Sequence, residues 1–161
     1  MKIIFYDFEV FKRLWLVVFI EYETKEKTII VNNKEKLLEF YNKNKDNIFC
    51  GYNSRGYDQF IFKGILKGID PYYITHEIIF NGKNGYQIIK EDNEFSLNNF
   101  DISTGFHSLK QLEGFMGSMI KEIPLPVDID RKLTKEEIEE VIKYCTHDVE
   151  QTIEVFNNRK E

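Results

Sequence analysis

Two carboxylates, Asp7 and Glu9, lie one residue apart in the N-terminal segment "IIFYDFEVF". The flanking residues are apolar, which predicts a buried β-strand, and residues i and i+2 of a strand point to the same face of the sheet. Like charges at that distance repel each other unless a positive charge lies between them. The spacing leaves two alternatives: a strand that has already ended in a solvated turn, or half of a site for a divalent metal ion.

Further acids later in the chain favour the metal site. Asp58 follows "GYNSRGY", where a predicted strand passes into a helix, and Asp148 lies within the long C-terminal helix. Tyr144 precedes Asp148 by four residues and therefore lies on the same side of that helix. Taken alone, Asp148 would be a surface residue and Tyr144 a packing residue. Together, acids from a strand, a loop and a helix can hold two Mg²⁺ or Mn²⁺ ions for in-line phosphoryl displacement.

These segments resemble the three motifs of the DEDD superfamily of 3′–5′ exonucleases. The motif D-x-E occurs in "YDFEVF", N-x-x-x-[FY]-D in "NSRGYD" and Y-x-x-x-D in "YCTHD", in the family's order. The likeness is greatest to the proofreading exonuclease domains of DNA polymerases, particularly phage-type ones. The family's histidine subclass has His where this chain has Lys143, and His147 has the wrong spacing. Tyr144 instead matches the tyrosine subclass. The resemblance implies an α/β fold with an RNase H-like mixed β-sheet flanked by α-helices.

The resemblance also implies roles for the acids and the tyrosine. Asp7 would bridge two Mg²⁺ or Mn²⁺ ions, Glu9 and Asp148 would complete the first site, and Asp58 would hold the second ion through water. Tyr144 would orient the attacking water, because an unperturbed phenol is a poor base at neutral pH.

The same resemblance places a set of residues at the nucleic acid. Asn53, Tyr57 and the backbone around Val10 would contact the 3′-terminal nucleotide. Phe8 or Phe11 would wedge between or stack on terminal bases, with core packing as the alternative for both. Lys12, Arg13, Arg55 and Lys110 lie near these segments and could contact phosphate, although each could equally be a solvated surface charge.

Length and composition limit the class of protein. A chain of 161 residues with 42% hydrophobic and 30% charged residues is expected to be a single soluble domain, residues 1–161. The net charge of −5 argues against a long nucleic-acid footprint and favours a short one in which metal ions supply positive charge. Two cysteines without metal-type spacing predict a reducing, cytoplasmic location (the host cytoplasm for a phage protein), and neither a signal peptide nor a membrane partner is expected.

Hydrophobic periodicity and turn residues predict the order of elements. Strands are expected at residues 2–8, 13–22, 27–33, 47–53 and 95–102, and helices at 34–44, 57–68, 71–80, 108–117 and 134–158. A capping box, Thr134-x-x-Glu137, should open the last helix. Three strands in a meander followed by alternating helices and strands indicate a mixed sheet with helices on its faces.

The expected function is metal-dependent hydrolysis of the 3′ ends of single-stranded or frayed DNA, which releases nucleoside 5′-monophosphates. An RNA or oligoribonucleotide substrate is an alternative within the same chemistry. A catalytically silent domain that binds nucleic acid or docks a polymerase is the alternative from another class; the presence of all four acids and the tyrosine argues against it. A DNA polymerase, in the same chain or as a separate protein, is the expected partner.

Overall fold

The computed structural model describes residues 1–90, 94–103 and 125–159. The helix expected at residues 108–117 lies outside this part of the chain. Within the described ranges, every helix is too short or too polar to cross a membrane.

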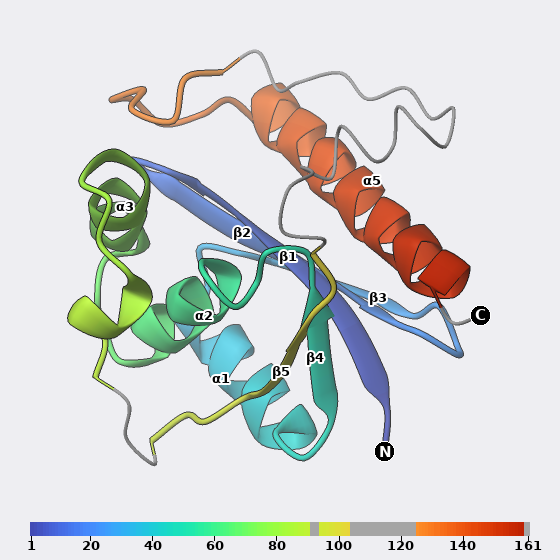
Figure 1. Cartoon of the computed structure of the whole chain (residues 1–161). Helices are drawn as coiled ribbons and strands as arrows, with labels where there is room; N and C mark the ends of the chain where they lie inside the picture. Colours follow the sequence, from blue (N-terminus) through green and yellow to red (C-terminus); the bar gives the residue numbers. More distant parts are fainter. Residues whose placement is uncertain (91–93, 104–124, 160–161) are drawn as a thin grey trace.

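A mixed sheet forms the centre of the described structure (Figure 1). Its order is β3-β2-β1-β4-β5. Strand β2 is antiparallel to both of its neighbours, whereas β1, β4 and β5 run parallel. The predicted α/β fold, a mixed sheet flanked by helices, is confirmed. The strands are β1 (Ile3–Phe11), β2 (Leu14–Glu21), β3 (Lys27–Val31), β4 (Ile48–Gly51) and β5 (Asn98–Asp101).

Helices cover both faces of the sheet, with α1, α2 and α3 on one side and α5 on the other (Figure 1). Their bounds are α1 (Lys34–Asn44), α2 (Asp58–Leu66), α3 (Pro71–Thr75), the π-helical turn η1 (His76–Phe80), the 3-10 turn η2 (Gly85–Gln87) and α5 (Lys135–Arg159).

Local sequence signals account for the ends of the helices. Asn33 caps α1 by accepting the N–H of Lys36, and Asp70 caps α3 by accepting that of Tyr72, each at 3.0 Å. Gly68, with φ +84°, lies two residues beyond the end of α2, in a conformation that glycine adopts without steric cost. The helix expected at 71–80 is instead α3 followed by the π-helical turn η1, which ends at Phe80.

The alternation of β1 divides the hydrophobic core into two layers. Ile4, Tyr6 and Phe8 pack into the layer under α1 and α2. Phe5 and Phe11 pack on the opposite face, in the layer that α5 covers with Val141, Cys145, Val149 and Ile153. Asp7 and Glu9 share the parity of Phe5 and Phe11 and therefore lie on the face covered by α5.

Candidate metal centre

Asp7 and Glu9 come together with a side chain from α5. Both acids are half-buried, and ligand atoms of Asp7, Glu9 and Cys145 all lie within 4.8 Å of one another. The Cys145 thiol donates toward the Asp7 backbone carbonyl at 3.2 Å and toward Asp7 Oδ2 at 3.5 Å. Strand β1 and helix α5 are thus in direct contact at the acid pair, and the alternative of a solvated turn after β1 does not hold.

Asp58 approaches the same strand from its edge. It is the first residue of α2 and is buried, and its Oδ1 accepts the backbone N–H of Phe8 at 3.0 Å. β1 pairs with β4 only along Ile3–Phe5, so the N–H of Phe8 lies beyond the end of that pairing. The carboxylate occupies the position where a longer β4 would have supplied a carbonyl oxygen, and this satisfies a buried donor.

Helical geometry relates Tyr144 and Asp148 to Cys145, which faces β1. At about 100° per residue, Tyr144 is rotated about 100° from Cys145, and Asp148 about 60° in the same sense. Both side chains are half-buried. Asp148 is close enough to raise the pKa of Asp7, of Asp58 and of the Cys145 thiol. Helix α5 therefore brings the fourth predicted acid to the other three.

Burial and mutual repulsion among the carboxylates raise the pKa of two acids in this cluster, Asp7 and Asp58. Burial raises the pKa of Asp7 well above its ordinary value, and the charges of Asp58, Glu9 and Asp148 raise it further. Burial also raises the pKa of Asp58 to about 8; the hydrogen bond from Phe8 opposes the shift, and the charges of Glu9 and Asp148 add to it. A divalent cation would remove this repulsion, and closely spaced carboxylate oxygens are the ligands that Mg²⁺ and Mn²⁺ prefer.

Cys145 adds a donor to the site rather than a thiolate ligand. Burial raises its pKa well above the usual value, and the negative charge of Asp7 raises it further. The thiol stays protonated at neutral pH and can hydrogen-bond to Asp7. The residues present therefore fit a hard cation held by oxygen atoms better than a thiophilic one.

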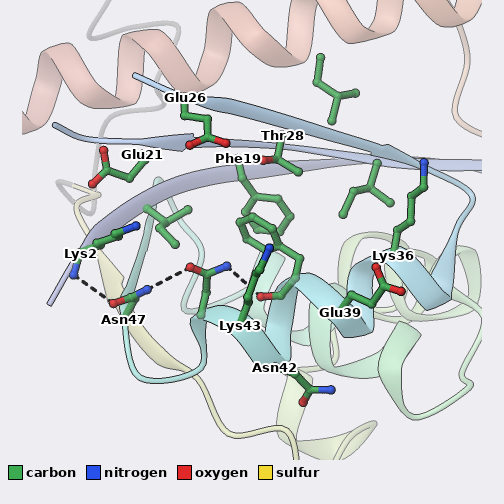
Figure 2. Close-up of a pocket in the computed structure, with 15 residues that line it drawn as sticks. Lys2, Phe19, Glu21, Glu26, Thr28, Lys36, Glu39, Asn42, Lys43 and Asn47 are labelled. Atoms are coloured by element: carbon green, nitrogen blue, oxygen red, sulfur yellow. Dashed lines mark hydrogen bonds between the residues drawn. The ribbon is translucent and has the colours of Figure 1, made fainter. Parts of the chain in front are cut away.

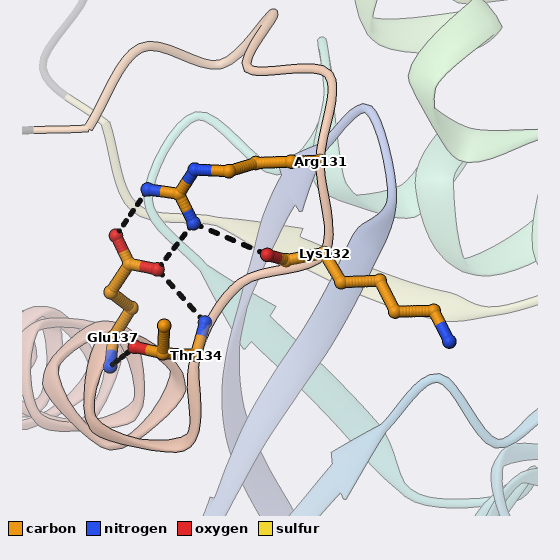
Figure 3. A network of polar contacts seen from close by, with 4 residues as sticks. All are labelled: Arg131, Lys132, Thr134 and Glu137. Carbon is orange, nitrogen blue, oxygen red and sulfur yellow. Dashed lines mark hydrogen bonds and ion pairs between the residues drawn. The ribbon is translucent and has the colours of Figure 1, made fainter.

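The predicted capping box sets the start of α5. Thr134 and Glu137 exchange backbone and side-chain hydrogen bonds of 2.8 and 3.1 Å, which confirms the box (Figure 3). Arg131 adds a bidentate contact to the Glu137 carboxylate at 2.7 and 2.8 Å. The box satisfies backbone N–H groups at the start of α5, whereas the buried residues Val141, Cys145 and Val149 mark the side of the helix that faces the sheet.

Of the residues expected to contact the nucleic acid, three on β1 have buried side chains and two lie at the loop before α2. Phe8 and Phe11 are each only 3% exposed and lie in opposite layers of the core. Both therefore follow the alternative of core packing rather than that of base stacking. The side chain of Val10 is buried, while its N–H is directed to the same edge of β1 as that of Phe8. Asn53 is exposed on the loop before α2, with φ +58°. The half-buried Tyr57 hydrogen-bonds to Thr75 at 2.8 Å.

Three of the four basic residues near the motifs lie within the described structure, and all three contact an aspartate. Lys12 and Arg13 both pair with Asp130, at 3.5 and 3.0 Å. The backbone of Arg55 is held by Asp101, and Lys110 lies outside the described residues.

Two residues at the site were missed from the sequence. Cys145 is buried on α5, and nothing local in the sequence indicated which strand residue it would contact. Asp101 ends β5, and its carboxylate accepts three backbone N–H groups, two of them from the loop before Asp58. The signal that could have found it is a lone acid at the end of a predicted strand in "NNFDI".

A groove lies elsewhere on the molecule, away from the cluster of Asp7, Glu9, Asp58 and Asp148. It has a volume of about 1160 Å³ and is lined by residues of α1, β2 and β3, with Ile4, Phe19 and Phe40 among its apolar residues (Figure 2). Ile4 and Phe19 belong to the core layer opposite α5, so the groove is on the other face of the sheet. Its lysines (Lys2, Lys36 and Lys43) and glutamates (Glu21, Glu26 and Glu39) are equal in number. Such a mixed lining does not favour a polyanion.

No protein-family model, curated protein or solved structure matches this chain. The exonuclease resemblance therefore remains a prediction, and a functional proposal has to rest on the acid cluster.

Proposed function

We propose that this chain is a divalent-metal-dependent 3′–5′ exonuclease that hydrolyses the terminal phosphodiester bond of single-stranded or frayed DNA. The observation that carries the proposal is the convergence of acids from β1, α2 and α5 around one stretch of β1, with Asp58 at the edge of that strand and Asp148 on the helix that covers one face of it. Asp7 and Glu9 lie within 4.8 Å of each other, and the pKa of Asp7 is raised by Asp58, Glu9 and Asp148. A buried carboxylate, Asp58, close to three half-buried ones that repel it and one another, is costly to maintain unless a cation binds there.

The acids would hold Mg²⁺ or Mn²⁺, two ions in the arrangement that the resemblance implies. Asp7, Glu9, Asp58 and Asp148 would together hold them. Bound ions would activate a water molecule for attack on phosphorus and stabilise the leaving oxygen. One oxygen of Asp58 accepts the Phe8 N–H, which leaves lone pairs of the carboxylate for an ion or its water.

The protein's own groups would orient the substrate and the attacking water. Tyr144, one turn before Asp148, would hydrogen-bond to that water. The N–H of Val10 and the exposed side chain of Asn53 would contact the terminal nucleotide. With Phe8 and Phe11 in the core, base stacking in this mechanism would have to come from other residues.

The test is a digestion of oligonucleotides labelled at the 3′ or the 5′ end, with Mg²⁺, Mn²⁺ or EDTA, on DNA and RNA in parallel. The expected result is immediate release of the 3′ label as a mononucleotide and a stepwise ladder from the 5′-labelled strand, both abolished by EDTA. Faster cleavage of RNA would change the substrate class within the same mechanism. Binding without cleavage under every metal condition would support the silent-domain alternative and refute the proposal.

A further inference from the structure

The Asp101 carboxylate accepts hydrogen bonds from two backbone segments, the loop after β4 and the residue two positions after the end of β5. Its Oδ1 accepts the N–H groups of Asn53 at 2.9 Å and Ser103 at 2.8 Å, and its Oδ2 accepts that of Arg55 at 3.0 Å. Asp101 is also the last residue of β5 and pairs with Gly51, the last residue of β4. The carboxylate therefore fastens the loop that leaves β4 to the strand beside it.

We propose that Asp101 is a positioning residue that holds loop 52–57 in the conformation that presents Asn53 and Asp58 to the metal centre. This inference rests on the proposed function, since it assigns Asp101 a role in the same site. Asp101 differs from the four acids of the proposed metal centre in its hydrogen bonds. Both of its oxygens accept backbone N–H groups, whereas Asp58 has one such bond in the described structure.

The loop needs such an anchor because its backbone is unfavourable. Asn53 has φ +58°, a left-handed conformation that costs a non-glycine residue roughly 1 kcal/mol or more, although asparagine tolerates it best. Within the turn, the bond from the Gly56 N–H to the Asn53 carbonyl is long, at 3.3 Å, while Gln59 of α2 donates to the carbonyls of Ser54 at 3.1 Å and Arg55 at 2.6 Å. The N–H groups of Asn53 and Arg55 are instead bonded to the Asp101 carboxylate, and bonds to a carboxylate are stronger than those to a neutral acceptor, so Asp101 can stabilise this part of the turn.

The anchored loop leads directly into the metal centre. Asp58 follows Tyr57, and its carboxylate is bonded to Phe8 of β1. The segment from 53 to 58 is therefore held at one end by Asp101 and at the other by the edge of β1. Release of the Asp101 end would let Asn53 and the start of α2 shift, and a displacement of about 1 Å at a reacting centre can lower a rate by on the order of 10²-fold.

The test compares Asp101→Ala and Asp101→Asn with a matched control, Asp70→Ala. Asp70 also accepts a backbone N–H at 3.0 Å, at the start of α3, so the control removes a similar bond elsewhere. Asn retains one oxygen and cannot satisfy both sets of donors, so it should have an intermediate effect. The readouts are amide hydrogen exchange at Asn53 and Arg55, Mn²⁺ affinity, and the rate of single-stranded DNA hydrolysis well below each variant's melting temperature.

For Asp101→Ala, faster exchange at Asn53 and Arg55 is expected, with a rate reduced on the order of 10²-fold and Mn²⁺ still bound. Asp70→Ala should lower the melting temperature and leave the rate unchanged. Wild-type exchange or a wild-type rate in Asp101→Ala would overturn the positioning role. Complete loss of Mn²⁺ binding would also overturn it, by making Asp101 a ligand. If the wild-type protein shows no hydrolysis, the proposed function fails, while exchange and Mn²⁺ affinity still decide whether Asp101 positions the loop.

Discussion

The Asp58 Oδ1 atom lies 3.0 Å from the backbone nitrogen of Phe8, a residue 50 positions earlier in the chain. This bond places an acid from the start of α2 beside the strand that carries Asp7 and Glu9. It exists because β4 stops pairing with β1 at Phe5 and leaves the edge of β1 open at Phe8. The end of one strand and the start of the next helix thus determine where the acids meet.

Replacing Asp7 by asparagine should abolish hydrolysis while the fold is retained. The substitution keeps the shape of the side chain and removes the charge that Asp58, Glu9 and Asp148 oppose. In EDTA at pH 8 the variant should therefore melt at a higher temperature than the wild type. Thermal unfolding and a single-turnover assay measure the two effects. Asp128→Asn, at an exposed position, is the control; wild-type turnover in Asp7→Asn would contradict the assignment.

The stability of the metal-free protein should fall as pH rises from about 4 to 8. The pKa of Asp58 is raised from 3.8 to about 8 in the folded protein, so across this window the folded state holds a proton that the unfolded state has released. The raised pKa of Asp58 alone should cost up to about 1.4 kcal/mol per pH unit within the window, and the raised pKa of Asp7 acts in the same direction. Unfolding by urea in EDTA, repeated with Mn²⁺, measures this; Mn²⁺ should stabilise most at pH 8. A metal-free stability that rises from pH 5 to 8 would be inconsistent with the raised pKa.

Tyr144→Phe should slow hydrolysis without eliminating it. If the phenol orients the attacking water, its loss should cost on the order of 10²–10³ in rate. Asp148→Ala should cost more, because it removes a proposed metal ligand. Phe preserves the ring, so the melting temperature and Mn²⁺ affinity of Tyr144→Phe should stay near those of the wild type. Single-turnover degradation of a short DNA at saturating Mg²⁺ compares the two, and a fully active Tyr144→Phe would return Tyr144 to a packing role.

Thr134→Ala should separate stability from activity. The hydroxyl accepts the Glu137 N–H at 3.1 Å at the start of α5, and loss of such a cap costs about 0.5–2 kcal/mol. Tyr144 and Asp148 lie about three to four turns further along the helix, so the rate per folded molecule should not change. Denaturant unfolding and the same single-turnover assay test both statements; a large loss of rate at full folding would show that the cap controls the position of Asp148.

Local patterns were sufficient to predict much of this protein from its sequence. The apolar segment at residues 2–8, the helical spacing at residues 34–44 and the Thr134 capping box correctly predicted a strand, a helix and the start of the last helix. These signals act between residues a few positions apart, where backbone geometry alone decides which side chains share a face. The same periodicity predicted that Asp7 and Glu9 share one face of a strand and that Tyr144 and Asp148 share one side of a helix.

Only the tertiary structure decided which elements meet. Phe8 and Phe11 could stack on bases or fill the core, and packing under α2 and α5 buried both. The contact of Cys145 with Asp7, the bond from Phe8 to Asp58 and the anchoring of loop 52–57 by Asp101 all join segments far apart in the chain. No periodicity encodes them, because they depend on the strand order and on where β4 and β5 end.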